Sequence, residues 1–231
     1  MEDPPGTASR AIVLRRRGDR RGAVDVNRLH RWYCRSDAWA ARMRDELPRV
    51  LRGVELGDEV LEVGPGPGVT TDLLRTRVPR VTAIEIDPHL AEALRQRTLG
   101  QDVEVVTGDA TAMPFQAERF SAVVSFTMLH HLPSPQSQDR LLAEAYRVLR
   151  PGGVFAGSDS TASFLFRLAH LGDTMVLVDP DRFACRLQAA GFTDARVRRS
   201  SGAFGFRATR PRTVREAPDA LGAAHQGVDQ G

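Results

Sequence analysis

The segment from Val60 to Gly68 constrains the fold of this chain more than any other part of the sequence. Its first residues, Val-Leu-Glu-Val, have the composition of a buried strand, and Gly64, Gly66 and Gly68 follow before a helical pattern that starts at Val69. Because glycine has no β-carbon, such a turn can take up positive φ and lets a bulky ligand approach its backbone. The segment therefore predicts a strand-to-helix crossover that binds a nucleotide.

A carboxylate stands near the end of the next predicted strand, Val81 to Ile86. Glu85 follows Gly64 by 21 positions, a spacing that suits an acidic side chain gripping two ribose hydroxyls. Nicotinamide-binding domains use the same device, but their Gly-x-Gly-x-x-Gly fingerprint needs its last glycine where this chain has Val69. Glu62, two residues before the first glycine, also suits a positively charged ligand better than a pyrophosphate. A third predicted strand is followed by a further carboxylate, Asp109.

In these segments the chain resembles the class I S-adenosylmethionine-dependent methyltransferases, in particular the small-molecule group that includes the quinone-biosynthesis C-methyltransferases. The resemblance spans about Asp58 to Arg210 and is specific because its motifs occur together in order and at the expected spacing. Ser121 departs from the family pattern, which more often has an aspartate there, but it lies at a strand start rather than at the ligand site. The motifs are Val60–Gly68, Val81–Pro88, Gly108–Phe115, Phe120–Ser125, Met128–Leu132 and Arg147–Gly153.

The resemblance implies that a sulfonium methyl group passes by in-line displacement from S-adenosyl-L-methionine to an oxygen, carbon or nitrogen atom of a small-molecule acceptor, with no metal. Good alignment of the two reactants can supply roughly 7 to 11 kcal/mol of such a barrier. The glycines would lie beside the methionine and ribose portions, Glu85 would bind the ribose, and Asp109 with Ala110 would lie at the adenine. Glu62 would either hold the turn or meet the cofactor's amino group. The implied cofactor-binding residues are Glu62, Gly64, Gly66, Gly68, Glu85, Ile86, Asp109 and Ala110.

Three residues are candidates for removing a proton from the acceptor. His130 and His131 come just after the fourth predicted strand, at the edge where the methyl group should point, and histidine is the side chain best suited to base catalysis near neutral pH. The same pair could instead order the loop. Tyr33 could reach the site from an N-terminal lid or could pack in the core.

The alternation of strands and helices predicts a Rossmann-like, doubly wound α/β fold. We expect a seven-stranded sheet, mostly parallel, with helices on both faces and an antiparallel hairpin strand at its C-terminal end. The expected strands are 60–63, 81–86, 103–106, 121–126, 153–158, 195–199 and 203–209, and the expected helices are 69–77, 88–98, 137–149 and about 180–190.

Outside this core the sequence predicts four further segments. Residues 1–25 read as a disordered, arginine-rich arm, 26–57 as a helical lid before the 58–210 domain, and 211–231 as a disordered tail. Residues 159–178 read as a segment that caps the acceptor or merely packs a helix onto the body. The side chains that would line an acceptor pocket there are Phe164, Phe166, Arg167, His170 and Met175.

Charge and composition limit the classes of partner. Residues 1–52 hold 13 arginines and 7 acidic residues, so the remainder of the chain carries a net −3 and argues against nucleic acid as the acceptor. All 32 basic residues are arginine, which indicates a compositional bias rather than selection at each site. No apolar run reaches the length of a membrane span or signal core, and the two cysteines show no metal spacing, so we expect a cytoplasmic protein with reduced thiols. The sequence does not indicate an oligomeric state.

Two alternatives of other classes stay open at this point. One is an RNA or protein methyltransferase that docks through the arginine arm, for which deletion of residues 1–25 would weaken acceptor binding in a salt-dependent way. The other is a NAD(P)-dependent reductase, or a cofactor-binding regulator without catalysis. Titration with S-adenosylmethionine against NAD would separate a methyltransferase from a reductase.

Overall fold

The computed structural model describes residues 36–161 and 175–212. Seven strands form one sheet, and helices flank it. In chain order the elements are α2 (Asp37–Val50), β1 (Glu59–Val63), α3 (Val69–Leu74), β2 (Arg80–Glu85), α4 (Pro88–Arg97), β3 (Val103–Thr107), β4 (Phe120–Phe126), the 3-10 helix η1 (Leu129–His131), α5 (Pro135–Val148), β5 (Leu149–Ser160), α7 (Pro180–Ala189), β6 (Thr193–Ser200) and β7 (Ala203–Thr209).

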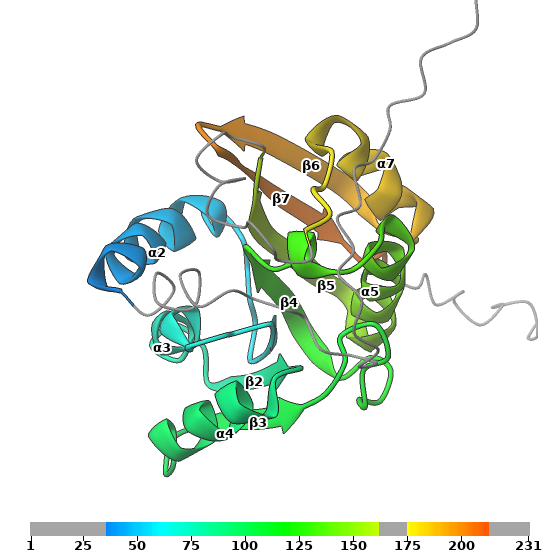
Figure 1. Cartoon of the computed structure of the whole chain (residues 1–231). Coiled ribbons are helices and arrows are strands. Elements are labelled where there is room, and N and C mark those ends of the chain that lie inside the picture. The colour runs from blue at the N-terminus through cyan, green and yellow to red at the C-terminus, as the bar shows by residue number, and fades with distance from the viewer. Residues whose placement is uncertain (1–35, 162–174, 213–231) are drawn as a thin grey trace, which may run out of the picture.

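The sheet has the strand order β3-β2-β1-β4-β5-β7-β6. Strands β1 to β5 pair in parallel, and β7 lies antiparallel to both β5 and β6. Helices α2, α3 and α4 lie on one side of the sheet, and α5 and α7 lie on the other (Figure 1). The predicted doubly wound sheet, with its antiparallel hairpin at the C-terminal end, is confirmed.

Three hydrophobic clusters of the described residues follow from the alternation of side chains along the strands, and the smallest of them packs α4 onto β2 and β3. In β1, Val60 packs in the core under α2 and α3, whereas Leu61 and Val63 pack in the larger core under α5 and α7. Both sets of side chains are almost fully buried, which explains why the strand reads as a nearly continuous apolar run. The one interruption, Glu62, lies on the same face as Val60 and therefore under α3.

The ends of several elements differ from the prediction. Helix α3 ends at Leu74 rather than at residue 77, and the chain continues in a turn in which the Arg77 and Val78 N–H groups both donate to the Leu74 carbonyl. Helix α5 begins two residues earlier than predicted because Ser134 caps it, accepting a hydrogen bond from the Ser137 N–H at 3.0 Å. Strand β2 ends at Glu85, so Ile86 lies just beyond it.

Strand β5 is the largest departure, because it starts at Leu149 instead of residue 153. Leu149 pairs with Phe120, and Val154 pairs with Ala122, so the register shifts between them. The Arg-Pro-Gly-Gly sequence that reads as a turn is thus an irregular stretch within a strand.

Several predicted features lie outside the described residues. They are the arm 1–25, Tyr33, Cys34, the aromatic and basic side chains Phe164, Phe166, Arg167 and His170, and the tail after residue 212. Helix α2 falls within the predicted lid, where Ser36 caps it and Met43 and Leu47 are buried. Cys185 is exposed as a free thiol.

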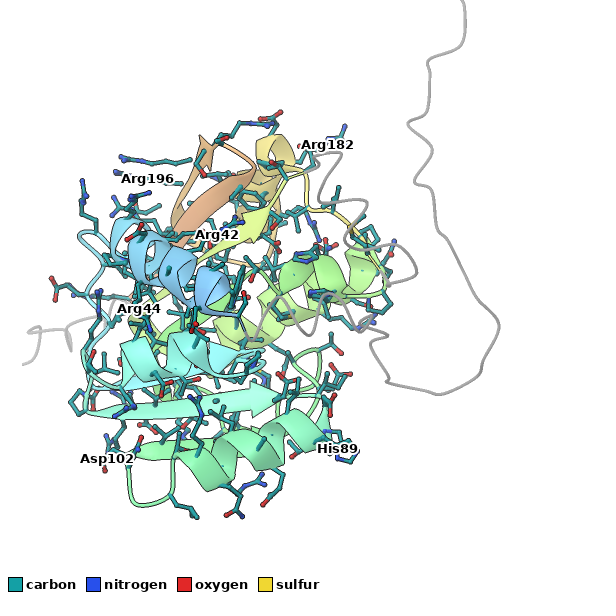
Figure 2. The ribbon with its side chains drawn as sticks, turned by 60° about the vertical axis from the view of Figure 1, so that its left-hand side comes forward. Arg42, Arg44, His89, Asp102, Arg182 and Arg196 are labelled. Carbon is teal, nitrogen blue, oxygen red and sulfur yellow. The ribbon has the colours of Figure 1, made fainter. Side chains whose placement is uncertain are left out.

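Arginines are spread over the surface of the described elements. Figure 2 shows Arg42 and Arg44 on α2, Arg182 on α7 and Arg196 on β6, and all four side chains belong to exposed residues. In the described part of the chain, no helix is long and apolar enough to cross a membrane.

Candidate active site

The glycine turn between β1 and α3 has the conformation that its sequence predicts. Gly64 and Gly66 have φ of 68° and 53°, in the left-handed region that glycine tolerates. A β-carbon on Gly64 would lie 2.3 Å from Cγ of Met128, whereas a β-carbon on Gly66 would meet no atom within 4 Å. The first glycine is therefore required for packing, and the second presents its backbone to open space that a ligand can occupy.

Glu85 lies next to this turn and is only 6% exposed. Its Oε2 accepts a hydrogen bond from the Gly66 N–H at 3.0 Å, and its Oε1 accepts one from the Asp87 N–H at 3.0 Å. Burial raises the pKa of this carboxyl, while the two backbone donors oppose that effect. The carboxylate predicted from spacing alone thus touches the turn itself.

The loop after β3 reaches the same place. The Gly108 N–H donates to the Glu85 carbonyl at 2.9 Å, and the Gly64 N–H donates to the Ile84 carbonyl at 2.9 Å, so three consecutive parallel strands end side by side. Asp109 is exposed, and its Oδ1 accepts a hydrogen bond from the Thr111 N–H at 2.7 Å. Ala110 and Ile86 are half-buried. The structure therefore gathers the predicted cofactor residues at one edge of the sheet.

Glu62 is buried beneath the first turn of α3. Its two oxygens accept hydrogen bonds from the hydroxyls of Thr70 and Thr71, the latter at 2.5 Å. Burial raises the pKa of this carboxyl to about 7, although the two threonine hydroxyls lower it. This geometry fits a carboxyl that fastens α3 to β1; its direct contact with a cofactor stays a prediction.

Arg97, at the end of α4, is part of the turn's support and was not predicted. Its Nη2 donates to the carbonyls of Pro67 and Gly68, both at 3.1 Å, and its Nη1 donates to Asp72 at 2.5 Å. A β-carbon on Gly68 would lie 2.3 Å from that Nη2. Arg97 thus stabilises the start of α3 through its side chain. No spacing pattern in the sequence predicts that contact.

The histidine pair lies on the neighbouring part of the same edge, directly after β4. His130 is 1% exposed, and its ring Nδ1 is hydrogen-bonded to Oδ1 of Asp159. His131 is half-buried, with its ring centroid 4.1 Å from that of His130. Met128, which begins this loop, lies against Gly64, so the loop that carries the histidines contacts the glycine turn.

Asp159 was missed as a site residue because the sequence shows it only within a Ser-Asp-Ser run at the end of a strand. Its side chain is fully buried, and Oδ1 also accepts a hydrogen bond from the Ser160 N–H at 2.6 Å. Thr127, between β4 and the histidines, has φ of 51°. Positive φ is strained for a β-branched residue, and such strain clusters at functional sites.

Comparisons with known proteins agree with this geometry. The sequence profile of the family described as "Methyltransferase domain" matches residues 61–157. A 2-methyl-6-phytyl-1,4-hydroquinone methyltransferase from Oryza sativa is 32% identical over 165 residues, which cover 70% of this chain and 49% of the relative. The chain thus spans about half the length of that relative.

Two further proteins to which the chain is similar are also named as methyltransferases. A ubiquinone biosynthesis O-methyltransferase from Pseudomonas entomophila is 31% identical over 160 residues, covering 64% of this chain and 66% of the relative. The crystal structure of a SAM-dependent methyltransferase from Aquifex aeolicus superimposes with a TM-score of 0.59 at 21% identity, covering 76% of this chain and 98% of that one, and it supports the fold. Residues 61–157 thus match the methyltransferase domain, and the comparisons support the class I S-adenosylmethionine-dependent methyltransferase that the motifs predicted.

Proposed function

We propose that this protein is an S-adenosylmethionine-dependent methyltransferase that acts on a small-molecule acceptor. The pairing of Gly66 with Glu85 carries the proposal. A glycine with positive φ presents its backbone to open space, and a buried carboxylate from the next strand is hydrogen-bonded to that backbone. Such a turn suits a nucleoside, and its Gly-x-Gly-x-Gly spacing suits a dinucleotide less well. When bound, the cofactor supplies a methyl group activated by the positive charge on sulfur.

The described residues divide the work of holding that cofactor. The backbone of the glycine turn lies beside its methionine and ribose portions, and Glu85, with Ile86 next to it, binds the ribose hydroxyls. Asp109 and Ala110 contact the adenine from the loop after β3. Glu62 supports the site indirectly, because it holds the first turn of α3 through its hydrogen bonds with Thr70 and Thr71.

For the acceptor we propose a phenolic or hydroquinone compound. The relatives from rice and Pseudomonas are named for hydroquinone and ubiquinone-pathway methylation, and their similarity covers most of the domain described here. A phenol gives up its proton near neutral pH more readily than an alcohol does, and a positioned histidine can take it. His130 or His131 is the proposed base, and Tyr33 stays a candidate from the segment before α2. A cytoplasmic location also stays a prediction.

Calorimetric titration tests the cofactor assignment. The protein should bind S-adenosylmethionine and S-adenosylhomocysteine saturably, and it should not bind NAD. The variant E85Q should lose about 10- to 100-fold in affinity, because hydrogen bonds to a charged group contribute about 1.5 to 3 kcal/mol. The control variant E92Q, which changes an exposed glutamate on α4, should bind as the native chain does. Saturable NAD binding without binding of either nucleoside would overturn the proposal.

Mass spectrometry tests the acceptor class. We expect a mass gain of one methyl group on some member of a panel of substituted hydroquinones and phenols incubated with S-adenosylmethionine. If none is methylated while RNA or a protein is, the acceptor proposal is wrong although the cofactor proposal stands.

A further inference from the structure

We infer that Asp159 is a positioning residue that holds His130 as the general base for the acceptor, an inference that rests on the proposed function. Its carboxylate holds this histidine at two points. Oδ1 is hydrogen-bonded to the ring Nδ1, and Oδ2 accepts a hydrogen bond from the His130 backbone N–H at 3.0 Å. A single side chain of β5 thus fixes both the backbone and the ring orientation of a residue that follows β4.

Burial explains why this carboxylate matters. His130 and Asp159 are 1% and 0% exposed, and a protonated imidazole at such a depth is costly unless a counter-charge lies beside it. Among the described residues, the titratable groups that face His130 are Asp159 on β5 and His131 on η1. Helix α5 contributes the uncharged Gln138 to this loop. Asp159 is therefore the one described anion placed to stabilise a proton taken up by His130.

The contact also selects the tautomer. A neutral imidazole that donates from Nδ1 to a carboxylate carries its lone pair on Nε2. In the proposed step the acceptor hydroxyl gives its proton to Nε2, and the acceptor oxygen forms the bond to the transferred methyl carbon. The electron pair of the broken carbon–sulfur bond stays on sulfur, and the imidazolium then returns its proton to water.

The backbone of the same loop is held from the opposite side by the predicted capping segment. The Val176 N–H donates to the His130 carbonyl at 2.8 Å, and Gln138 Nε2 donates to the carbonyls of Leu129 and Val176 at 3.1 and 2.7 Å. The Gln138 Oε1 in turn accepts a hydrogen bond from Arg186 of α7 at 2.9 Å. The ring, the N–H and the carbonyl of His130 are therefore all anchored, as the geometry of a base requires.

Nuclear magnetic resonance of the histidine side chains tests the inference without an acceptor. In the full chain saturated with S-adenosylhomocysteine, the 15N shifts of His130 should show the hydrogen on Nδ1. In D159N that tautomer should lose its dominance. A native His130 with its hydrogen on Nε2 would overturn the inference. This measurement on the native chain decides the matter even if D159N fails to fold.

Kinetic measurements use a compound of the phenol and hydroquinone panel that the protein methylates. They distinguish an Asp159 that supports a general base from an Asp159 that only orders the loop. D159N should lower kcat by at least tenfold and by no more than the roughly 10²- to 10⁴-fold that a general base supplies in full. Its affinity for S-adenosylhomocysteine should change by less than twofold. The ascending limb of its pH profile should move to lower pH, since the imidazolium loses its counter-charge. D159E, which keeps the charge, should recover part of the rate.

D181N is the matched control, because Asp181 is an exposed carboxylate of α7 that pairs with Arg199. It should leave kcat and its pH profile unchanged. A D159N protein that binds S-adenosylhomocysteine and turns over with the native pH profile would overturn the inference and leave the proposed function intact. Loss of nucleoside binding by the native chain would instead refute the proposed function itself.

Discussion

The guanidinium of Arg97 donates a hydrogen bond to the carbonyl of Gly68 at 3.1 Å and so ties the end of α4 to the start of α3. The same side chain bonds to Pro67 and Asp72. Because Gly68 closes the turn that contains Gly66, these hydrogen bonds make Arg97 a support of the glycine turn.

Replacing Arg97 with alanine should loosen the turn. We expect R97A to lower the free energy of unfolding by about 1 to 2 kcal/mol and to weaken S-adenosylhomocysteine binding several-fold, since two backbone carbonyls lose their donors. Urea denaturation and calorimetry measure the two effects. R75A is the control, because Arg75 also pairs with Asp72 but is the exposed C-cap residue of α3. Equal effects of both variants on affinity would contradict this role.

Alanine substitutions in the glycine turn should distinguish a glycine that is needed for packing, Gly64, from a glycine that is needed for cofactor binding, Gly66. G64A should be the more destabilising, because its new methyl group would overlap Met128. G66A should cost only the strain of alanine at positive φ, roughly 1 to 2 kcal/mol, yet it should weaken S-adenosylhomocysteine binding at least tenfold. G100A is the control, since Gly100 has φ of 75° and also has no atom within 4 Å of its β-carbon position. If G66A bound the nucleoside as tightly as G100A does, the cofactor would not lie against Gly66.

Glu62 should make stability depend on pH. Burial raises the pKa of its carboxyl from 4.5 to about 7, so the folded state holds this proton more tightly than the unfolded state. The resulting stabilisation is fully present below pH 4.5 and is lost as the pH rises through about 7. The shift corresponds to a loss of about 3 kcal/mol at most.

Urea denaturation of the native chain and of E62Q between pH 4.5 and 8 checks this. The native chain should lose stability relative to E62Q as the pH rises, because glutamine has no proton to lose. E55Q, at an exposed position before β1, should follow the native chain. Parallel stability curves for the native chain and E62Q would show that Glu62 titrates normally.

Ser121 should matter for stability and not for the cofactor. Its hydroxyl donates to the carbonyl of Leu56 at 2.7 Å and accepts from the Glu59 N–H at 2.9 Å, so it fastens the start of β1 at the amino edge of the sheet. S121A should lower the free energy of unfolding by about 1 to 2 kcal/mol and leave S-adenosylhomocysteine affinity unchanged. Thermal denaturation and calorimetry measure these effects. T76A, an exposed hydroxyl in the link after α3, should change stability by less than about 0.5 kcal/mol.

The glycine turn and its contact with Glu85 could be predicted from the sequence because their geometry is local. Strand, glycine turn and helix follow one another between Val60 and Leu74, and parallel strands must end at the same edge of the sheet. Glu85 could therefore be assigned from spacing alone, and the structure places it against Gly66. The boundaries of β5 could not be predicted, since Pro151, Gly152 and Gly153 are turn formers that here continue a strand.

By itself the sequence determined the fold class, the order of the strands along the chain and the edge at which the glycine turn and Glu85 meet, because these follow from periodicity and from short-range turns. Only the tertiary structure decided which side chains support the site. Asp159 lies 29 residues from His130, and Arg97 lies 29 residues from Gly68. Such contacts depend on how β5 lies beside β4 and how α4 packs near α3, and no local pattern encodes those distances.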